Sequence, residues 1–259
     1  MAKLFIKLIL LLFFVGFSGA QDTLCVYKSK GSLFLENKGA LSPLNKGGLI
    51  NKNNLVKVLS QAELTAIDKN GIPYNVNVEG KYGFSDLLNF KVKQKTSNLT
   101  ASYFKYIWEE LTHSGDKTAL IAGVFRGDLL MTSPKDSCKI ASSKVTLKWE
   151  TLEESELYYV FIRNTKTDEV LKFETNGSHM ALYDDNPIFY EGDRFEWAVT
   201  TDAFPNLDNT PFFSFNLIDR NTYEEEKLAF QEFMLDLKNV GISENEIETI
   251  LCETYGLCK

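Results

Sequence analysis

Few residues in this chain could carry out catalysis, because it contains two histidines, His113 and His179. A serine or cysteine nucleophile needs a positioned base, and no recognisable catalytic motif surrounds either histidine. A cluster of acidic residues could instead bind calcium or supply the carboxylate pair of a glycosidase. Its members are Asp184, Asp185, Glu191 and Asp193. We interpret these as exposed loop residues, and we expect no enzymatic activity, no cofactor and no metal site.

The cysteines suggest structural rather than catalytic chemistry. They number four, an even count that indicates disulfides in an exported chain, and they are Cys25, Cys138, Cys252 and Cys258. Gly256 can end a helix and fold Cys258 back towards Cys252, so we predict that these two pair and leave Cys25 for Cys138. No CxxC motif occurs and both histidines are distant in sequence, which disfavours a metal site.

Three residues are candidates for binding a ligand. Tyr103 and Trp108 could stack on a sugar or a peptide, although they belong to an apolar stripe at helical spacing, for which packing in a protein core is the favoured interpretation. Arg126 stands between two glycines and could hold a carboxylate, with a salt bridge between domains as the favoured interpretation.

The elements that would position these residues begin with a β domain at residues 21–95. Short apolar or alternating segments are separated there by turns rich in Asn and Gly, which is typical of a small antiparallel sandwich or barrel. Three segments, Lys30–Leu35, Leu44–Ile50 and Ser60–Gly71, resemble the FecR-like domain of bacterial envelope proteins. In that family the domain follows a membrane helix in signalling proteins, whereas a cleavable signal is expected to precede it here.

A linker helix and bridge are predicted at residues 96–142, followed by a second sandwich at residues 143–219. Val145, Leu147 and Trp149 alternate with polar residues, and further strands follow at sandwich spacing. This alternation, together with an aromatic strand after the glycine turn in Tyr190–Val199, resembles a fibronectin type III or related immunoglobulin-like domain. The resemblance implies a fold, and that fold hosts many different functions.

Residues 220–259 are predicted to form a helical hairpin. Its first helix covers Tyr223 to Lys238 with Asn221 or Thr222 as cap, and the second begins with a Ser243 and Glu246 capping box. The expected fold class is therefore mainly β, with two small antiparallel sandwich or barrel domains joined by a helix and a C-terminal helical hairpin.

Residues 1–20 have the pattern of an export signal. Basic residues precede an apolar run that is short for a membrane span, and small residues then lead to an expected cleavage between Ala20 and Gln21. A retained anchor is the alternative. The pattern predicts a periplasmic or secreted protein that meets the membrane transiently, through its signal.

The charge distribution limits the partners. The net charge is −7 and the basic residues form no cluster, so nucleic acid is not an expected partner. We expect a non-enzymatic interaction or scaffold module that binds an unidentified envelope protein. The alternative is a protein that binds peptidoglycan or another cell-wall glycan.

Overall fold

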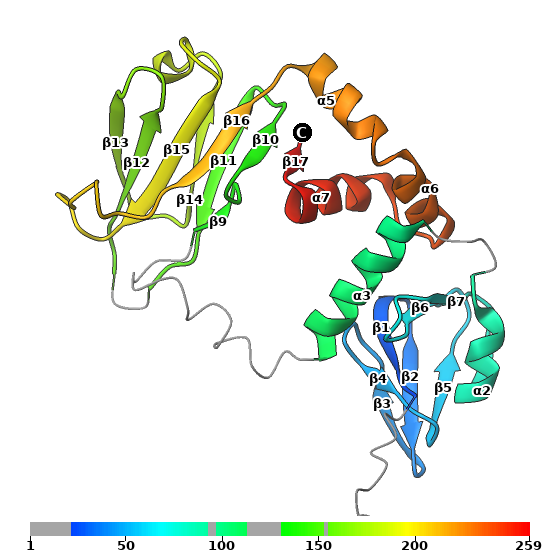
Figure 1. Cartoon of the computed structure of the whole chain (residues 1–259). Coiled ribbons are helices and arrows are strands. Elements are labelled where there is room, and N and C mark those ends of the chain that lie inside the picture. Colours follow the sequence, from blue (N-terminus) through cyan, green and yellow to red (C-terminus); the bar gives the residue numbers. More distant parts are fainter. Residues whose placement is uncertain (1–21, 93–96, 113–130, 153–154) are drawn as a thin grey trace, which may run out of the picture. The chain divides into compact units, whose positions relative to one another are not determined.

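The computed structural model describes residues 22–92, 97–112, 131–152 and 155–259 (Figure 1). The chain divides between His113 and Ser114 into two compact units, called unit 1 and unit 2. Both contain antiparallel strand pairs, and helices gather at the carboxyl end of the sequence. The predicted fold class, mainly β with sandwich domains and a C-terminal helical region, is confirmed.

Unit 1 contains two four-stranded sheets with the orders β4-β1-β6-β7 and β3-β2-β5-β8. All of their strand pairs are antiparallel. The strands are β1 Leu24–Lys30, β2 Leu33–Asn37, β3 Ala40–Pro43, β4 Leu49–Ile50, β5 Asn54–Val58, β6 Glu63–Ile67, β7 Pro73–Val76 and β8 Gly80–Gly83. One apolar core joins both sheets, and it includes Val26, Val56 and Leu64, all with no exposed surface. Two short helices follow β8, α2 at Phe84–Leu87 and the 3-10 helix η1 at Leu88–Phe90.

The turn between β6 and β7 requires a glycine at its end. Asp68 Oδ1 accepts hydrogen bonds from the backbone N–H groups of Asn70 and Ile72, each at 2.9 Å. Gly71 has a φ of +76°, and a Cβ there would collide with the backbone carbonyl of Ala101. Glycine therefore serves both the turn conformation and the close approach of a helix.

That helix is α3, Asn98–Thr112, which packs on β1. The backbone N–H of Thr100 donates to Ser97 Oγ at 3.2 Å, which confirms the predicted cap. Phe104 is entirely buried, and its ring meets the Tyr27 ring edge-on with 5.3 Å between centroids. The apolar stripe is thus core packing, and the helix predicted as a linker belongs to unit 1.

Unit 2 is a β-sandwich whose sheets have the orders β13-β12-β15-β16-β10-β17 and β14-β11-β9. Its strands are β9 Met131–Ser133, β10 Cys138–Ile140, β11 Lys144–Trp149, β12 Tyr158–Asn164, β13 Val170–Thr175, β14 His179–Tyr183, β15 Arg194–Thr200, β16 Phe213–Leu217 and β17 Leu257–Cys258. The 3-10 helix η3 covers Pro187–Phe189. Leu147 from one sheet and Trp197 from the other share one core, and neither has exposed surface.

One part of the sandwich departs from the expected antiparallel pairing. β10 runs parallel to both of its neighbours, β16 and β17. The backbone N–H of Lys139 donates to the Gly256 carbonyl at 2.7 Å, and that of Ala141 donates to the Cys258 carbonyl at 2.9 Å. The last residues of the chain therefore extend the larger sheet at the β10 edge.

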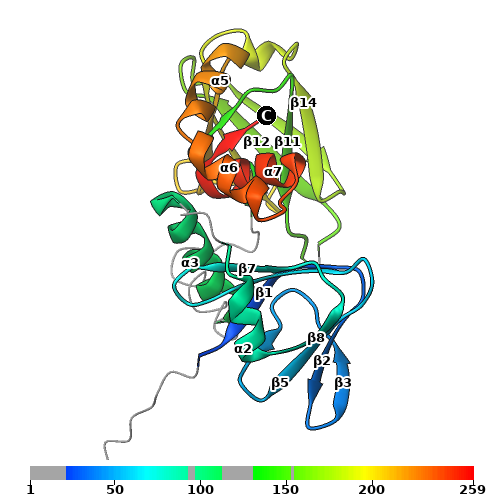
Figure 2. The ribbon, with the colours of Figure 1, turned by 90° about the vertical axis from the view of Figure 1, so that its right-hand side faces the viewer.

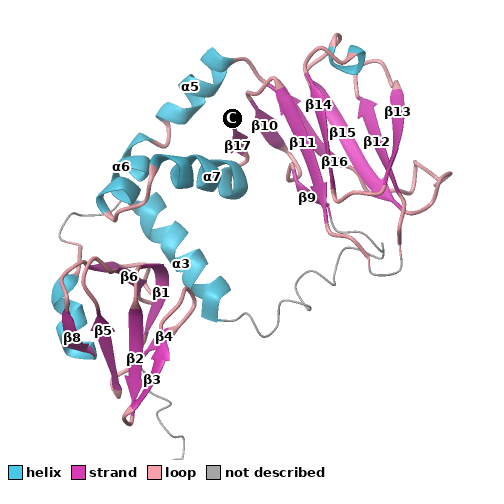
Figure 3. Ribbon diagram, turned by 180° about the vertical axis from the view of Figure 1, so that it is seen from behind, coloured by secondary structure: helices cyan, strands magenta, loops and turns pink. Residues whose placement is uncertain are grey.

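The C-terminal region contains three helices rather than the predicted two. They are α5 Arg220–Leu228, α6 Gln231–Asn239 and α7 Glu244–Tyr255, and they lie on the side of the sandwich that carries β10 and β17 (Figures 1 and 2). The predicted first helix is divided at Ala229 and Phe230, and the Phe230 ring packs against Tyr255 with centroids 5.0 Å apart. Figure 3 shows the resulting separation of strands and helices within this unit.

The ends of these helices agree in part with the prediction. Asp219, not Asn221 or Thr222, caps α5, and its Oδ1 accepts from the backbone N–H groups of those two residues at 2.8 and 3.0 Å. The predicted capping box of Ser243 and Glu246 is present at the start of α7. α7 ends at Gly256, which adopts the left-handed conformation and turns the chain into β17.

Candidate functional site

The predicted ligand-binding residues of α3 do not form an exposed platform. Tyr103 is 5% exposed, and its hydroxyl lies 3.1 Å from that of Tyr27 inside unit 1. Trp108 is half-buried on the same helix. Tyr103 is therefore a core residue, as the favoured interpretation of the stripe predicts, and its covered ring offers no face for the alternative role of stacking on a ligand. Arg126, like the expected cleavage residues Ala20 and Gln21, lies outside the described residues.

All four residues of the acidic cluster are exposed, as the sequence interpretation has them. Glu191 lies 3.8 Å from the Lys166 ammonium, as one partner of an exposed ion pair. His179 begins β14 and Asp184 follows its end, about 16 Å away along an extended strand. The described residues include no group of three or more His, Cys, Asp or Glu side chains placed to hold a metal ion.

The structure instead gathers aromatic rings and cations on the outer face of the larger sheet of unit 2. Alternation along β12 points Val160 and Ile162 into the core and places Tyr159, Phe161 and Arg163 on the opposite face. Lys172 of β13 lies directly across from Phe161 in the antiparallel register. Long side chains on this face therefore meet by strand pairing alone.

Lys172 is surrounded by three aromatic rings. Its ammonium nitrogen lies 4.3 Å from the ring centre of Phe204, 4.5 Å from that of Tyr159 and 5.9 Å from that of Phe161. The same ammonium donates a hydrogen bond to the Ala203 carbonyl. Each ring face attracts the cation, so these contacts hold the loop after β15 over the sheet. Phe204 as a whole residue is nevertheless 89% exposed.

The loop at residues 201–212 is ordered by its own polar side chains. Thr200 Oγ1 accepts from the Asp202 backbone N–H at 3.0 Å, and Asp202 Oδ1 accepts from that of Phe204 at 2.9 Å. Further along, Asn206 Oδ1 accepts from the backbone N–H of Asp208 at 3.1 Å. Such side-chain turns restrict the loop backbone and present Phe204 in a defined position.

A second cation and ring extend the same surface. The Arg163 guanidinium carbon lies 4.5 Å from the ring centre of Phe212, and Arg163 Nη1 lies 3.4 Å from Glu196 Oε2. We call the whole set the aromatic–cation surface. It consists of Tyr159, Arg163, Lys172, Phe204 and Phe212, with the buried Phe161 ring beneath them.

Sequence reasoning did not find this surface, although one signal for it exists. The segment Leu157–Ile162 is predicted as a strand with two apolar faces, and a sandwich core can cover just one of them. Aromatic residues on the other face must then meet a loop or a partner. Phe204 itself stands between turn residues, and nothing local in the sequence distinguishes it from a buried loop residue.

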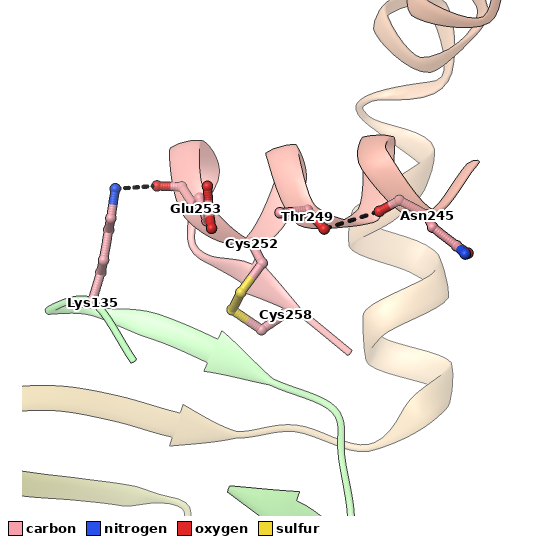
Figure 4. Close-up of a disulfide and its surroundings, with 6 residues drawn as sticks. All are labelled: Lys135, Asn245, Thr249, Cys252, Glu253 and Cys258. Carbon is pink, nitrogen blue, oxygen red and sulfur yellow. Dashed lines mark hydrogen bonds between the residues drawn. A yellow bond between two sulfur atoms is a disulfide. The ribbon is translucent and has the colours of Figure 1, made fainter. Parts of the chain in front are cut away.

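The disulfide of unit 2 fastens the C-terminal strand to its helix. Cys252 and Cys258 are bonded with a Cα–Cα distance of 4.2 Å, so the prediction for this pair is confirmed (Figure 4). Lys135 Nζ also donates to the Glu253 carbonyl at 2.7 Å (Figure 4). These contacts hold the end of α7 beside β10, on the side of the sandwich away from β13.

The predicted bridge between Cys25 and Cys138 is absent. Both cysteines are free thiols, 0% and 1% exposed, within different units. A bond between two such side chains would require at least one core to open. Burial raises the pKa of each thiol to about 11. For Cys138, a backbone hydrogen bond lowers the pKa in part, and the negative charge of Asp136 raises it further. Both thiols are thus uncharged at neutral pH.

Comparison with known proteins assigns no family: no protein-family model matches the chain, and a search of curated proteins found no match. Among the described residues, no helix combines the length and apolar character needed to cross a membrane.

Proposed function

We propose that this chain is an exported, non-enzymatic protein of the bacterial envelope that binds another envelope protein through the aromatic–cation surface. The observation that carries the proposal is Phe204, a residue 89% exposed whose ring is yet held over Lys172. A positioned aromatic side chain loses little conformational freedom when a partner covers it. Aromatic residues and arginine are also enriched where protein interfaces are most buried.

The proposed compartment is supported by two independent features. Residues 1–20 carry the pattern of an export signal, and Cys252 is bonded to Cys258. Disulfides persist in oxidising compartments such as the periplasm or the cell exterior. We therefore propose a periplasmic or secreted protein.

The strand connections support the proposed immunoglobulin-like character of unit 2. The chain passes from β11 in the smaller sheet to β12 in the larger, and again from β14 to β15. Immunoglobulin-type sandwiches cross between sheets in the same way. Unit 1 enters the proposal as a FecR-like domain, supported by its short antiparallel strands between residues 24 and 83.

Glycan binding is less well supported than protein binding. That alternative depends on Tyr103 and Trp108, of which Tyr103 is buried and Trp108 is half-buried. The rings on the aromatic–cation surface are instead combined with two cations, Arg163 and Lys172. Such a mixture fits a protein surface that offers both apolar and polar groups.

Site-specific photo-crosslinking in intact cells tests the proposal. A photoreactive phenylalanine derivative replaces Phe204 in one variant and Tyr190 in the control, because Tyr190 is 70% exposed in the same unit but does not belong to the aromatic–cation surface. We expect one reproducible protein adduct from position 204 and none of the same identity from position 190. The purified pair should bind about tenfold or more weakly with Phe204→Ala.

Other outcomes would overturn the proposal. Adducts shared equally by the two positions would mean that neither reports a specific site. Adducts confined to cell-wall fragments would replace protein binding with glycan binding. Unchanged affinity after Phe204→Ala would remove the aromatic–cation surface from the interface.

A further inference from the structure

The strand β13 is the longest edge strand in the described part of the chain. It spans six residues, Val170–Thr175, and pairs with β12 on one side and with no other described strand. It contains neither proline nor glycine, which commonly interrupt edge strands. The other described edge strands have two to five residues.

The backbone groups that face outward from β13 follow from its pairing with β12. The Asn164 N–H donates to the Glu169 carbonyl at 2.9 Å, so these opposed residues form a hydrogen-bonded pair. Such pairs alternate along antiparallel strands. Residues 171, 173 and 175 therefore direct their N–H and C=O groups to β12, while Val170, Lys172 and Glu174 direct theirs to the free edge.

The side chains of β13 are also incompletely covered. Leu171 and Phe173 pack against the sandwich core but remain half-buried at its edge. On the outer face, Lys172 and Glu174 are exposed, and neither forms an ion pair with another described residue. The strand thus offers free backbone groups, a partly covered apolar row and two opposite charges, of which the Lys172 ammonium contacts rings and a carbonyl but no carboxylate of the described residues.

We infer that two copies of this chain form a dimer by antiparallel pairing of their β13 strands, with the twofold axis at Phe173. A twofold axis perpendicular to the sheet keeps both sheet faces continuous. In such a dimer, directly opposed residues must lie on the same sheet face, so one residue of β13 lies on the axis and faces its own copy. In the middle of the strand, that residue is Lys172, Phe173 or Glu174. Centring on Lys172 or Glu174 places two like charges directly opposite each other.

Centring on Phe173 instead joins opposite charges twice. Lys172 of one copy then faces Glu174 of the other, and the symmetric pair repeats this contact. Both residues have outward-facing backbone groups, so each of these pairs is a hydrogen-bonded pair. Phe173 meets its own copy in the intervening non-hydrogen-bonded position, where side chains approach most closely. Charge and apolar contact favour this register, and the outward-facing backbone groups also form hydrogen bonds in it.

The dimer would join two aromatic–cation surfaces on one continuous sheet face. Lys172 belongs to that surface and also to β13, so the two surfaces would lie on either side of the twofold axis. A partner that itself carries two binding sites would then bind the second surface at a raised effective concentration. The inference of a dimer does not depend on the identity of that partner.

Charge exchange between Lys172 and Glu174 tests the inferred register. Sedimentation velocity of the full mature chain, over a wide concentration range, should show a monomer–dimer equilibrium. Lys172→Glu or Glu174→Lys creates two like-charge contacts and should weaken dimerisation by about tenfold or more. The double exchange K172E/E174K should restore the dimer, and so should an equal mixture of the two single variants.

A crosslink at the axis provides the second measurement. Phe173→Cys should form a disulfide between copies under oxidation, because a non-hydrogen-bonded antiparallel pair has a Cα–Cα distance of about 4.5 Å, within the range of disulfides. Thermal unfolding checks that each variant folds. A wild-type chain that stays monomeric at every concentration overturns the inference. The inference is also overturned if both Lys172→Glu and Glu174→Lys still dimerise as the wild type does. It is overturned as well if the equal mixture of these two variants fails to dimerise.

Discussion

The two free thiols provide a quantitative test of the buried cores. Cys25 belongs to unit 1 and Cys138 to unit 2, and burial raises the pKa of each to about 11. At pH 8 about one such thiol in 1,000 is ionised, against about a quarter for an exposed cysteine. Because the thiolate is the reactive form, we expect alkylation of the native protein to be at least about 200-fold slower than that of the unfolded chain.

The same pKa shift predicts a loss of stability at high pH. The folded thiols keep their protons up to a pKa of about 11, whereas the unfolded thiols lose theirs around the ordinary cysteine pKa of about 8.5. The unfolded state therefore binds fewer protons in this window, and stability falls as the pH rises through it. By pH 10 each thiol should reduce the free energy of unfolding by on the order of 1 kcal/mol. The Cys25→Ala variant should lack this contribution in unit 1.

Mass spectrometry after alkylation is the assay. Without reductant, the native chain should remain unlabelled over a period in which the urea-unfolded chain gains two labels, at Cys25 and Cys138. Adding a reductant in urea should then expose Cys252 and Cys258. Rapid labelling of either buried thiol in the native chain would refute the burial argument. If the unfolded chain instead gains no label without reductant, Cys25 and Cys138 must be bonded to each other, as the sequence predicts.

Two further changes probe each unit separately. The double variant C252A/C258A removes a disulfide between residues six positions apart, so the free energy of unfolding of unit 2 in urea should fall by about 2 kcal/mol. An unchanged unfolding midpoint would contradict the proposed fastening of β17. Phe104→Ala removes an entirely buried ring and should destabilise unit 1 by about 3–5 kcal/mol, whereas exposed Lys105→Ala should change it by less than about 0.5 kcal/mol in the same calorimetric measurement.

The strands of the sandwich could be predicted because their pattern is local. Val145, Leu147 and Trp149 alternate with polar residues in the sequence, and all three are buried in the core of unit 2. One side of a strand must face the core, so a period of two identifies both the strand and its inner face. The capping box of Ser243 and Glu246 could be predicted for the same reason, since its partners lie three residues apart.

Features that depend on distant partners could not be predicted. The division of one expected helix at Ala229 and Phe230 accompanies a contact between Phe230 and Tyr255, which local spacing does not report. The parallel pairing of β10 with β17 joins segments more than a hundred residues apart. Apolar periodicity indicates that one face of a helix or strand is covered, but it does not identify the element that covers this face.

The same limit explains the outcome for the candidate site. Tyr103 and Phe204 are both aromatic. Tyr103 is a candidate from sequence because its ring could stack on a ligand, although the helical stripe that contains it favours core packing. That stripe is evidence for a core, and Tyr103 is 5% exposed, whereas Phe204 is 89% exposed. The exposed Phe204 ring is held in place by residues distant in sequence. Lys172 of β13 contacts it directly, and Lys172 in turn contacts the Tyr159 ring of β12.

Lys172 connects the two proposals physically. Its stem leaves an edge strand whose backbone groups are free, and its ammonium is held among the rings of the aromatic–cation surface. A second β13 strand would bring a carboxylate near this ammonium without displacing the rings, because ring faces and a carboxylate can occupy different sides of one cation. Dimerisation should then further restrict the loop that presents Phe204. Glu174→Lys, which weakens the dimer and leaves Lys172 in place, should therefore increase hydrogen exchange at residues 201–204.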